Sequence, residues 1–323
     1  MPEFDLPPPS EKVIDRASEL LIARGVRVTK GVAISRFTTF RVGGPAALLA
    51  EVEDVEQLTA VGEVAESLKV PSMVLGRGSN VLVSDEGFPG VVVRMRRGFD
   101  QITGLGNEVR AGAAASLPQV ANWASRRALS GLEFSIAIPA SVGGAVKMNA
   151  GAHGSSVSDV LSSAQVCHLA TGEVRDISVD ELAMSYRSSS LGPSDVVCSA
   201  TFLLVSADAE QIAAKMEANR KHRADTQPID APNAGSMFKN PQGASAGALI
   251  EGSGLKGKRV GKAEVSVKHA NFFLGRDGAS AQDVYDLMAL VQEVVSREHS
   301  VLLVPEVRLV GRYRDPERLR EHP

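Results

Sequence analysis

The sequence predicts an α+β protein with two or three domains, and three observations lead to this prediction. The chain has 323 residues, more than the roughly 250–300 residues that one hydrophobic core usually supports. Helical and strand patterns follow one another without the regular β–α–β alternation of a doubly wound sheet. Apolar residues make up 44% of the chain and charged residues 23%, which is the ordinary composition of a globular protein.

The first half of the chain predicts helices and short strands in turn. Apolar residues at helical spacing predict helices, and β-branched runs bounded by glycine predict strands. Asp54 followed by Gln57 has the pattern of a helix capping box. In order, we expect a helix over residues 10–24, a loop, a strand over 39–42 broken by Gly43-Gly44-Pro45, a helix after Asp54, strands over 70–75 and from 91, and a helix over 117–129.

The second half predicts strands over residues 164–205 and a helix that begins at Asp208. Ser280 and Asp283 match the capping signature before an apolar-striped helix over 284–295. The last strand, over 301–311, is interrupted at Pro305, and the charged tail after Arg312 is expected to fray. The predicted organisation is an N-terminal helix and lead-in over 1–34, a first domain over 35–209, a second over 210–300, and a final strand and tail over 301–323.

Charge and hydropathy exclude two function classes. The net charge is −3 and no long basic run occurs, so a nucleic-acid surface is not supported. The short cluster Arg94, Arg96 and Arg97 is interpreted as a solvated strand end. The acidic, proline-rich N-terminus lacks the pattern of a signal peptide, and the longest apolar stretch, 196–205, is too short to span a bilayer. We therefore expect a cytoplasmic protein that has no membrane partner.

The two cysteines, Cys167 and Cys198, lie in apolar strand-like runs. Their spacing does not match a metal site. We expect buried thiols in a reducing compartment and no bound metal.

Two glycine-rich segments are candidates for binding a ligand. In Gly76-Arg77-Gly78-Ser79-Asn80, the glycines allow backbone N–H groups to approach a phosphate closely. The segment is neither a dinucleotide fingerprint nor a P-loop, because neither a helix nor Lys-Ser/Thr follows it. The alternative is a plain glycine-rich turn. Residues 134–154 have almost no charge and cannot form an ordinary core strand or helix; they suit a backbone wrapped around a flat ligand, or a buried crossing of two sheets.

The stretch APNAGSMFKNP, residues 231–241, places Ser236 after a turn. From these residues alone, the favoured interpretation is a hydroxyl that caps its own turn. The alternative is a hydroxyl that takes part in chemistry.

Eight segments occur in order between about residues 35 and 311: FTTFRVGGPA, LGRGSNVLVSDEGFPGVVV, GLEFSIAIPASVGGAVKMNAGAHG, MSYRSS, PNAGSMFKNP, AGALIEGSGLKG, VSVKHANFFLG and PEVRLVG. With these segments the chain resembles the UDP-N-acetylenolpyruvoylglucosamine reductase family, in the type that lacks an inserted substrate loop.

The resemblance implies noncovalent FAD in a two-part domain of the vanillyl-alcohol-oxidase (PCMH) type over residues 35–209, with a smaller α+β substrate-binding domain over 210–300. Neither histidine nor cysteine occurs in the first loop, although His153 lies close to the second. The implied FAD-binding residues are Gly76, Arg77, Gly78, Ser79, Asn80 and Val81 in the first loop, and Pro139, Ser141, Gly143, Gly144, Asn149 and Gly151 in the second.

The resemblance also implies that NADPH reduces the flavin, which then transfers hydride to the vinyl carbon of UDP-N-acetylglucosamine enolpyruvate in peptidoglycan precursor synthesis. Ser236 would give the proton to the α carbon, Arg187 would hold the carboxylate, and Glu306 would assist Arg187 and the enolic intermediate. The alternatives are a strand-end Arg187 and a salt bridge from Glu306 to Arg308 or Arg312. Candidate ligands for the UDP-sugar are Lys239, Asn240, Arg223, Lys268 and His269.

The chain departs from the family pattern at several positions, none of which removes a catalytic group. Two rivals remain: an alcohol or sugar oxidase of the same fold, often with covalent flavin, and a flavin-binding module without catalysis. We expect a monomer. The departures are Ala140, His153, Ser188 and Lys262, and the absence of a second glutamate upstream of Glu306.

Overall fold

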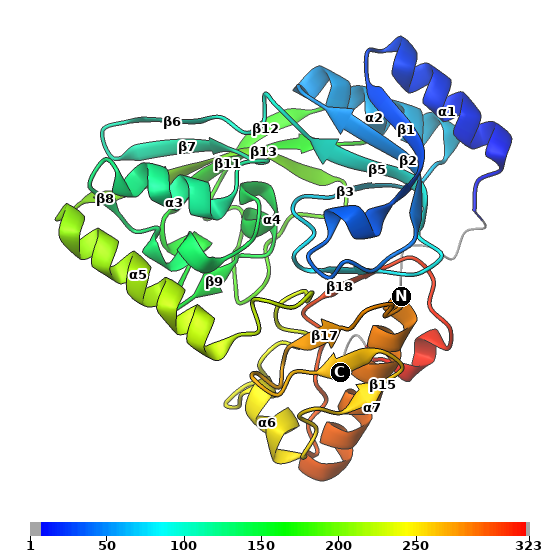
Figure 1. Cartoon of the computed structure of the whole chain (residues 1–323). Helices are drawn as coiled ribbons and strands as arrows, with labels where there is room; N and C mark the ends of the chain where they lie inside the picture. The colour runs from blue at the N-terminus through cyan, green and yellow to red at the C-terminus, as the bar shows by residue number, and fades with distance from the viewer. Residues whose placement is uncertain (1–7, 321–323) are drawn as a thin grey trace.

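The computed structural model describes residues 8–320, and residues 1–7 and 321–323 lie outside the described part. These residues form three sheet-containing units (Figure 1), and a cleft is lined by residues from all three. Helices and strands are mixed without βαβ regularity, which confirms the predicted α+β class.

The first unit is a four-stranded sheet in the order β1-β2-β5-β3. β1 pairs antiparallel with β2, whereas β2–β5 and β3–β5 are parallel. Helix α2 covers the sheet and α1 packs against α2. The elements are α1 (Glu11–Ala23), β1 (Arg27–Ala33), η1 (Ile34–Phe37), β2 (Pro45–Val52), α2 (Val55–Leu68), β3 (Ser72–Val74), β4 (Val81–Val83) and β5 (Phe88–Met95).

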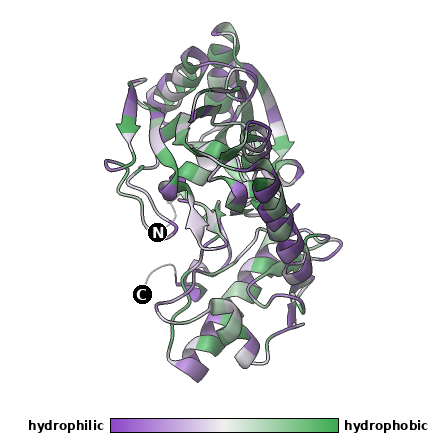
Figure 2. Ribbon diagram, turned by 90° about the vertical axis from the view of Figure 1, so that its left-hand side faces the viewer, coloured by the Kyte–Doolittle hydropathy of each residue, from purple (hydrophilic) through white to green (hydrophobic). Residues whose placement is uncertain are grey.

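The second unit is an antiparallel sheet in the order β12-β11-β13-β7-β6, with α3, α4 and the long helix α5 beside it (Figure 1). Ile212 and Met216 of α5 belong to its core, and the outer face of α5 is hydrophilic (Figure 2). The elements are β6 (Ile102–Leu105), β7 (Glu108–Gly112), α3 (Leu117–Ser125), β8 (Leu129–Ser130), η2 (Glu133–Ala137), α4 (Val142–Lys147), β9 (Gly151–Ala152), β10 (Ser155–Ser156), η3 (Val157–Asp159), β11 (Leu161–His168), β12 (Val174–Ser178), β13 (Asp195–Leu203), β14 (Val205–Ser206) and α5 (Ala209–Thr226).

The third unit packs helices α6 and α7 with the small antiparallel sheet β15-β16-β17. Its last strand, β18, pairs in parallel with β4 and so ties the C-terminal part back to the first unit. The elements are α6 (Ala246–Gly252), β15 (Arg259–Val260), β16 (Ala263–Val265), β17 (Phe273–Gly275), α7 (Ala281–His299), β18 (Arg308–Val310) and η4 (Pro316–Arg318).

The predicted helix starts are confirmed. Asp54 and Asp208 each accept a hydrogen bond from the backbone N–H three residues on, at 2.8 and 2.9 Å. Ser280 and Asp283 form a full capping box at α7. At α2 the Gln57 side chain accepts from the N–H of Glu53, one residue earlier than a capping box requires. These caps satisfy N–H groups that have no partner within the helix.

Two strand predictions near the N-terminus are wrong. Residues 39–42 form a loop, because the Thr39 N–H donates to the Gly78 carbonyl at 3.0 Å instead of joining a sheet. Strand β1, over residues expected to be a loop, was missed because it is an edge strand with mostly exposed or half-buried side chains. Its sequence therefore lacks the alternation that marks a half-buried strand.

Predictions for three later segments also need correction. Helix α3 ends at Ser125 rather than at residue 129, and the strand expected over 301–311 is reduced to β18. The tail packs rather than frays as far as residue 320: Leu319 is only 4% exposed, and the Tyr313 hydroxyl donates to the Leu82 carbonyl at 2.6 Å. Residues 321–323 of this tail lie outside the described part.

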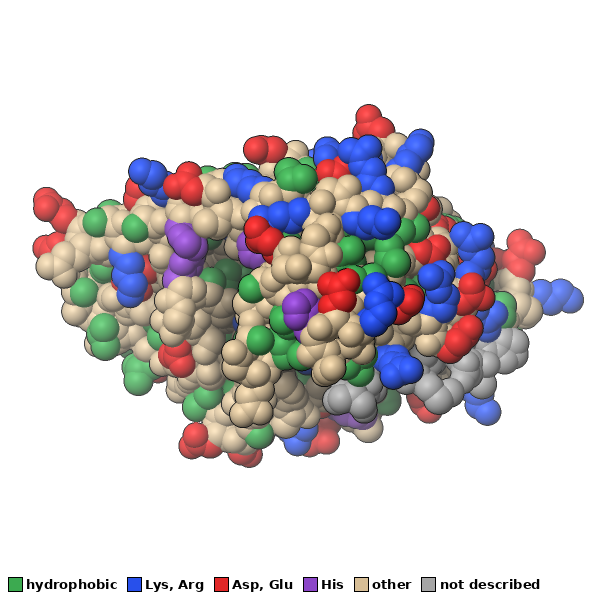
Figure 3. Space-filling view, turned by 90° about the horizontal axis from the view of Figure 1, so that it is seen from below, with side chains coloured by type: hydrophobic (Ala, Val, Ile, Leu, Met, Phe, Trp, Pro, Cys, Tyr) green, Lys and Arg blue, Asp and Glu red, His purple; other side chains and the backbone are tan. Residues whose placement is uncertain are grey.

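The surface and the thiols show no unusual feature in the described residues. Cys167 and Cys198 are buried free thiols, and burial raises the pKa of Cys198 to about 12. On the face seen from below, cationic and anionic side chains are interspersed (Figure 3). Within residues 8–320, helices are too short or too polar to cross a membrane, and groups of three or more metal-ligating side chains do not occur.

Candidate active site

A cleft of about 1880 Å³ lies where the three units meet. Its walls include the turn over 76–80, helix α4, the loop over 227–236 and the segment over 304–310. Pockets for one small ligand are typically about 300–1,000 Å³. The cleft therefore has room for an elongated cofactor and a second ligand beside it.

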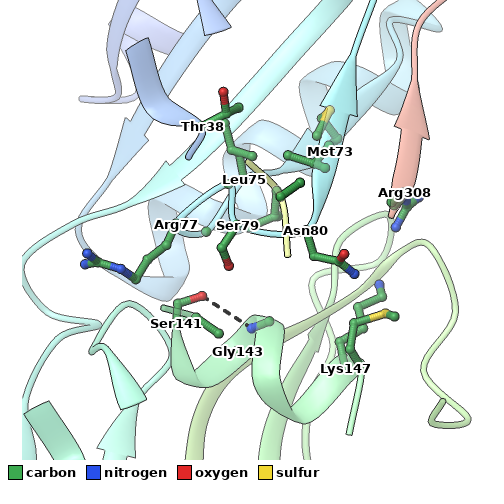
Figure 4. A pocket seen from close by; sticks show the side chains of 18 of the residues that line it. Thr38, Met73, Leu75, Arg77, Ser79, Asn80, Ser141, Gly143, Lys147 and Arg308 are labelled. Atoms are coloured by element: carbon green, nitrogen blue, oxygen red, sulfur yellow. Dashed lines mark hydrogen bonds between the residues drawn. The ribbon is translucent and has the colours of Figure 1, made fainter. Parts of the chain in front are cut away.

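The two glycine-rich segments face each other across this cleft. A Cβ built on Gly76 would lie 2.4 Å from the Ser141 Oγ, and one on Gly78 would lie 2.3 Å from the Phe37 carbonyl oxygen. Gly78 also has φ +61°, in the left-handed region that favours glycine. Figure 4 shows Ser79 and Asn80 pointing from the turn toward α4, which carries Ser141 and Lys147. The turn thus exposes backbone and small polar side chains to the cleft.

The second segment contains a helix, contrary to expectation. Residues 142–147 form the short helix α4, and its N-cap Ser141 accepts from the Gly144 N–H at 3.4 Å. Gly143 packs against Ala113, where a Cβ would lie 3.0 Å from that methyl group. The lack of side chains lets the helix approach strand β7, which explains why a glycine pair is tolerated inside it.

The bend that carries Ser236 is held by another residue. The Asn233 Oδ1 accepts from the Gly235 N–H at 2.9 Å, and its Nδ2 donates to the Ala231 carbonyl at 2.7 Å. Gly235 has φ +75°. The Ser236 hydroxyl lines the cleft and makes no hydrogen bond to any described residue. Ser236 therefore does not cap its own turn, and its hydroxyl remains available to a ligand.

Arg187 and Glu306 form a partly buried ion pair beside this bend. The Arg187 Nε donates to the Glu306 Oε1 at 2.8 Å, and their side chains are 22% and 12% exposed. The Arg187 Nη2 donates to the Gly151 carbonyl at 2.9 Å, and Nη1 to the Asn149 carbonyl at 3.4 Å. A guanidinium has five N–H donors, so two remain for a ligand carboxylate. The alternative partners expected for Glu306, Arg308 and Arg312, do not form this ion pair.

The backbone at Arg187 is strained. Arg187 has φ +56°, inside a tight turn closed by reciprocal hydrogen bonds between Ser185 and Ser188 at 3.1 and 3.2 Å. A non-glycine residue in this region costs free energy and persists where the surroundings fix it. The strain points to a side chain that is needed at this place.

Glu306 is hydrogen-bonded to the glycine turn, to the bend that carries Ser236 and to Arg187. Its N–H donates to the Met237 carbonyl at 2.8 Å, next to Ser236, and its carbonyl accepts from the Asn80 Nδ2 at 3.1 Å. Burial raises the pKa of the Glu306 carboxyl above its ordinary value, although the charges of Arg187 and Lys239 act in the opposite direction. A carboxyl with a raised pKa can hold or release a proton nearer neutral pH.

The structure brings most of the predicted site residues together, but not all. Besides Ser236, Arg187 and Glu306, the cleft is lined by every predicted FAD-binding residue except Asn149, and by Arg223 and Lys239. Burial lowers the pKa of the Arg223 guanidinium. Asn149 is 5% exposed and its side chain accepts from the Ser158 N–H at 3.0 Å, so it fixes the loop beside Arg187 instead.

Three predicted substrate ligands lie outside the cleft lining. The Asn240 Oδ1 accepts from the Ala246 N–H at 3.0 Å, near the start of α6. The Lys268 Nζ donates to the Ala224 carbonyl at the end of α5. The His269 ring packs edge-on against Phe272, with centroids 4.7 Å apart. In this structure Asn240 and Lys268 bond to neighbouring elements, and His269 packs within its own loop.

The interpretation of Arg94 as a solvated strand end is wrong. Arg94 is half-buried in the cleft wall with its guanidinium carbon 4.4 Å from the centre of the Phe37 ring. Sequence reasoning also missed Lys147, Asp195 and Arg308 as cleft-lining residues. Arg94 follows three buried valines on β5, and a charge directly after a buried parallel strand was the signal that could have marked it.

The cleft fits FAD. Its two glycine-rich walls allow close backbone approach, as a diphosphate and a flat ring system require, and its volume exceeds the need of a single small ligand. Gly76–Asn80 and the segment from Pro139 to Gly151 are the parts that would hold it.

Comparisons with known proteins agree with this reading. Residues 46–178 match the family model of an FAD binding domain, and residues 227–310 match that of the UDP-N-acetylenolpyruvoylglucosamine reductase C-terminal domain. The first match, together with the superposition on a reductase crystal structure, confirms the predicted two-part FAD-binding fold of the vanillyl-alcohol-oxidase type.

Two relatives share the length of the chain. A UDP-N-acetylenolpyruvoylglucosamine reductase of Symbiobacterium thermophilum is 43% identical over 88% of this chain and 92% of its own. One of Bacillus licheniformis is 39% identical over 94% of this chain and 100% of its own. The crystal structure of the Thermus caldophilus reductase superposes with a TM-score of 0.78 at 38% identity, covering 88% of this chain and 100% of that one.

Proposed function

Because the chain belongs to the UDP-N-acetylenolpyruvoylglucosamine reductase family, and is thus an FAD-binding oxidoreductase, we propose that it reduces UDP-N-acetylglucosamine enolpyruvate to UDP-N-acetylmuramate with NADPH. This step belongs to peptidoglycan precursor synthesis. The observation that carries the proposal is that Ser236, Arg187 and Glu306, from three separate segments, line the same cleft as the glycine-rich walls.

FAD held by Gly76–Asn80 and the segment from Pro139 to Gly151 would, once reduced by NADPH, supply the hydride for the terminal vinyl carbon of the substrate. The electron pair of the double bond then moves toward the carboxylate, so negative charge grows there and on the α carbon. The residues of this chain need to hold the carboxylate, stabilise this charge and deliver one proton.

Arg187 holds the carboxylate. Its Nε is bonded to Glu306 and its two other bonds go to backbone carbonyls, so the guanidinium is fixed before the substrate arrives. The two remaining N–H donors match a planar carboxylate. A preorganised cation in a partly buried site stabilises developing charge without first having to reorient.

Ser236 gives its hydroxyl proton to the α carbon. A serine hydroxyl is a weak acid, but an enolate is a strong base, so the transfer needs fixed geometry more than a shifted pKa. The Asn233-held bend supplies that geometry. Glu306 orients Arg187, and its carbonyl and N–H join the strand to both the glycine turn and the serine bend.

NADPH and the substrate would use the cleft in turn. The chain lacks a nicotinamide fingerprint in its sequence, and a cleft of about 1880 Å³ exceeds the room that one small ligand needs, which supports a shared site beside FAD. Lys239 and Arg223 line this space and would face the diphosphate of either.

An oxidase of the same fold would not need this proton donor and carboxylate clamp. Among the described cleft-lining residues, His153 is the one histidine or cysteine, so a covalent flavin link would have to use it. Acid precipitation separates the two cases: noncovalent FAD leaves the protein, whereas a covalent flavin stays in the pellet.

The function is tested by following the flavin absorbance of the purified protein without oxygen. We expect a bound-FAD spectrum, bleaching on addition of NADPH, and recovery of the oxidised spectrum when UDP-N-acetylglucosamine enolpyruvate follows. Recovery with oxygen alone, and none with the substrate, would instead identify an oxidase. A colourless protein that does not take up added FAD would refute the proposal.

A further inference from the structure

Two buried side-chain polar atoms in residues 8–320 have no hydrogen-bond partner: the Arg94 Nε and the Asp195 Oδ1. Both residues line the cleft. Buried polar atoms are nearly always paired in native proteins, and an unpaired one calls for an explanation, such as a ligand. One of these atoms is a cationic donor and the other an anionic acceptor.

Among residues 8–320, no carboxylate forms an ion pair or hydrogen bond with Arg94. The neighbouring acid, Glu51, is bound by the Arg96 Nε at 3.1 Å and the Arg27 Nε at 3.5 Å. Burial lowers the pKa of the Arg94 guanidinium; the positive charges of Arg96 and Arg77 act in the same direction, and the negative charge of Glu51 acts against them. A partly buried cation with cationic neighbours favours an anionic ligand, and phosphate matches a guanidinium well.

Asp195 has one carboxylate oxygen that is free to accept a hydrogen bond from a ligand. Its Oδ2 accepts from the Gly192 N–H at 2.9 Å, whereas its Oδ1 lies 3.9 Å from the Arg175 Nη2, beyond hydrogen-bond distance. The side chain is only 13% exposed. A hydroxyl or amine donor on a ligand would satisfy this oxygen.

The strand segments that carry the two residues pack on the same hydrophobic core. Val93 and Val196, their chain neighbours, lie in one hydrophobic core. The residues that flank Ser236 and Glu306, Met237 and Val307, lie in a different core. The strand segments that carry Arg94 and Asp195 therefore adjoin a different core from the segments that carry Ser236 and Glu306.

The glycine turn begins beside Arg94 and ends beside Glu306. The Leu75 N–H, directly before the turn, donates to the Val93 carbonyl at 2.9 Å, and Asn80, at its end, donates to the Glu306 carbonyl at 3.1 Å. A cofactor whose reactive ring lies near Glu306 would thus extend past the turn toward Arg94.

We infer that Arg94 and Asp195 bind the ADP half of FAD, Arg94 through a phosphate oxygen and Asp195 through a ribose hydroxyl or the adenine amino group. ADP carries both an anionic acceptor and neutral donors, so it satisfies both unpaired atoms. The inference rests on FAD being the cofactor of the proposed function.

The test measures flavin affinity rather than turnover. Full-length Arg94→Met and Asp195→Asn proteins are stripped of flavin and titrated with FAD and with riboflavin, which has no ADP. Asp195→Asn keeps the shape but places an amide, a weaker acceptor and partly a donor, where Oδ1 stood. Losing one charge-assisted hydrogen bond weakens binding by about 10- to 100-fold. We expect the FAD Kd to rise by this factor and the riboflavin Kd to stay within about 2-fold.

Matched controls are Arg110→Met and Asp176→Asn, which change an arginine and an aspartate outside the cleft lining. Their FAD Kd should equal that of the unchanged protein. FAD affinities of Arg94→Met and Asp195→Asn that equal those of the controls would overturn the inference. So would an unchanged FAD Kd with weaker NADPH binding, because the ADP would then be that of NADPH. A protein that binds neither FAD nor riboflavin would refute the proposed function as well.

Discussion

Replacing Gly78 with alanine tests whether the glycine turn must approach the chain as closely as the structure shows. Gly78 has φ +61°, and a Cβ there would lie 2.3 Å from the Phe37 carbonyl oxygen and 2.8 Å from the Thr38 Cα. Both atoms belong to the backbone, so a side-chain rotation cannot relieve the contact. The turn, or residues 37–38, would have to move.

Two terms set the magnitude. A left-handed backbone costs a non-glycine residue about 1 kcal/mol, and overpacking against a fixed neighbour costs about 1–3 kcal/mol. We therefore expect Gly78→Ala to lose about 2–4 kcal/mol of unfolding free energy. Since the displaced turn also forms the FAD cradle, the FAD Kd should rise by about 10-fold or more, which corresponds to ~1.4 kcal/mol.

Gly106→Ala is the matched control. Gly106 has φ +58°, but a Cβ there has no atom within 4 Å, and the residue does not line the cleft. It carries only the conformational term, so it should lose about 1 kcal/mol and leave FAD binding unchanged. Urea unfolding of the FAD-free proteins and FAD titration measure the two effects. Equal losses in both variants, with equal FAD affinity, would refute the reasoning.

Two further substitutions test the ion pair and the anchoring of α7. The activity should need ionised Glu306 to hold Arg187, and the raised pKa of Glu306 moves the acid limb of the kcat/KM profile upward in pH. Glu306→Gln should lower kcat/KM and abolish that limb. An unchanged pH profile in this variant would exclude this role for Glu306. The Asp85 carboxylate accepts hydrogen bonds from the first two N–H groups of α7, at 2.8 and 3.0 Å; Asp85→Ala should cost about 1–2 kcal/mol in urea unfolding, and a loss no larger than that of the neighbouring Glu86→Ala would contradict it.

Local signals predicted the helix starts and the glycine turn well. Caps at Asp54, Asp208 and Ser280 depend on residues three apart, and the turn over 76–80 depends on glycine's freedom at positive φ. Such signals lie within a few residues of one another, so they can be read from the sequence alone.

Features that depend on distant partners could not be predicted in this way. Strand β1 has few buried side chains and owes its place to pairing with β2, and β18 is a strand only because it pairs with β4. The tail after Arg312 is polar, yet it packs through Tyr313 and Leu319. Propensity does not record such tertiary contacts.

In the candidate site, too, local signals could be read from the sequence, whereas contacts with distant partners could not. From the residues alone, Ser236 was best interpreted as capping its turn, and its free hydroxyl became evident only once Asn233 was seen to hold the bend. The partner of Arg187 lies 119 residues away, and the role of Arg94 in the cleft wall depends on its packing against Phe37. The family resemblance indicates which residues are candidates for catalysis, and the structure supplies their partners.

The most direct test of the account is a single-turnover experiment with Ser236→Ala, in which the two half-reactions are timed separately without oxygen. We expect NADPH to bleach the variant's flavin at nearly the normal rate, while its reoxidation by UDP-N-acetylglucosamine enolpyruvate slows by about 10²- to 10⁴-fold, the usual contribution of a positioned proton donor. Substrate-driven reoxidation at the rate of the unchanged protein would show that another group delivers the proton, and would contradict the placement of Ser236 at the centre of this site.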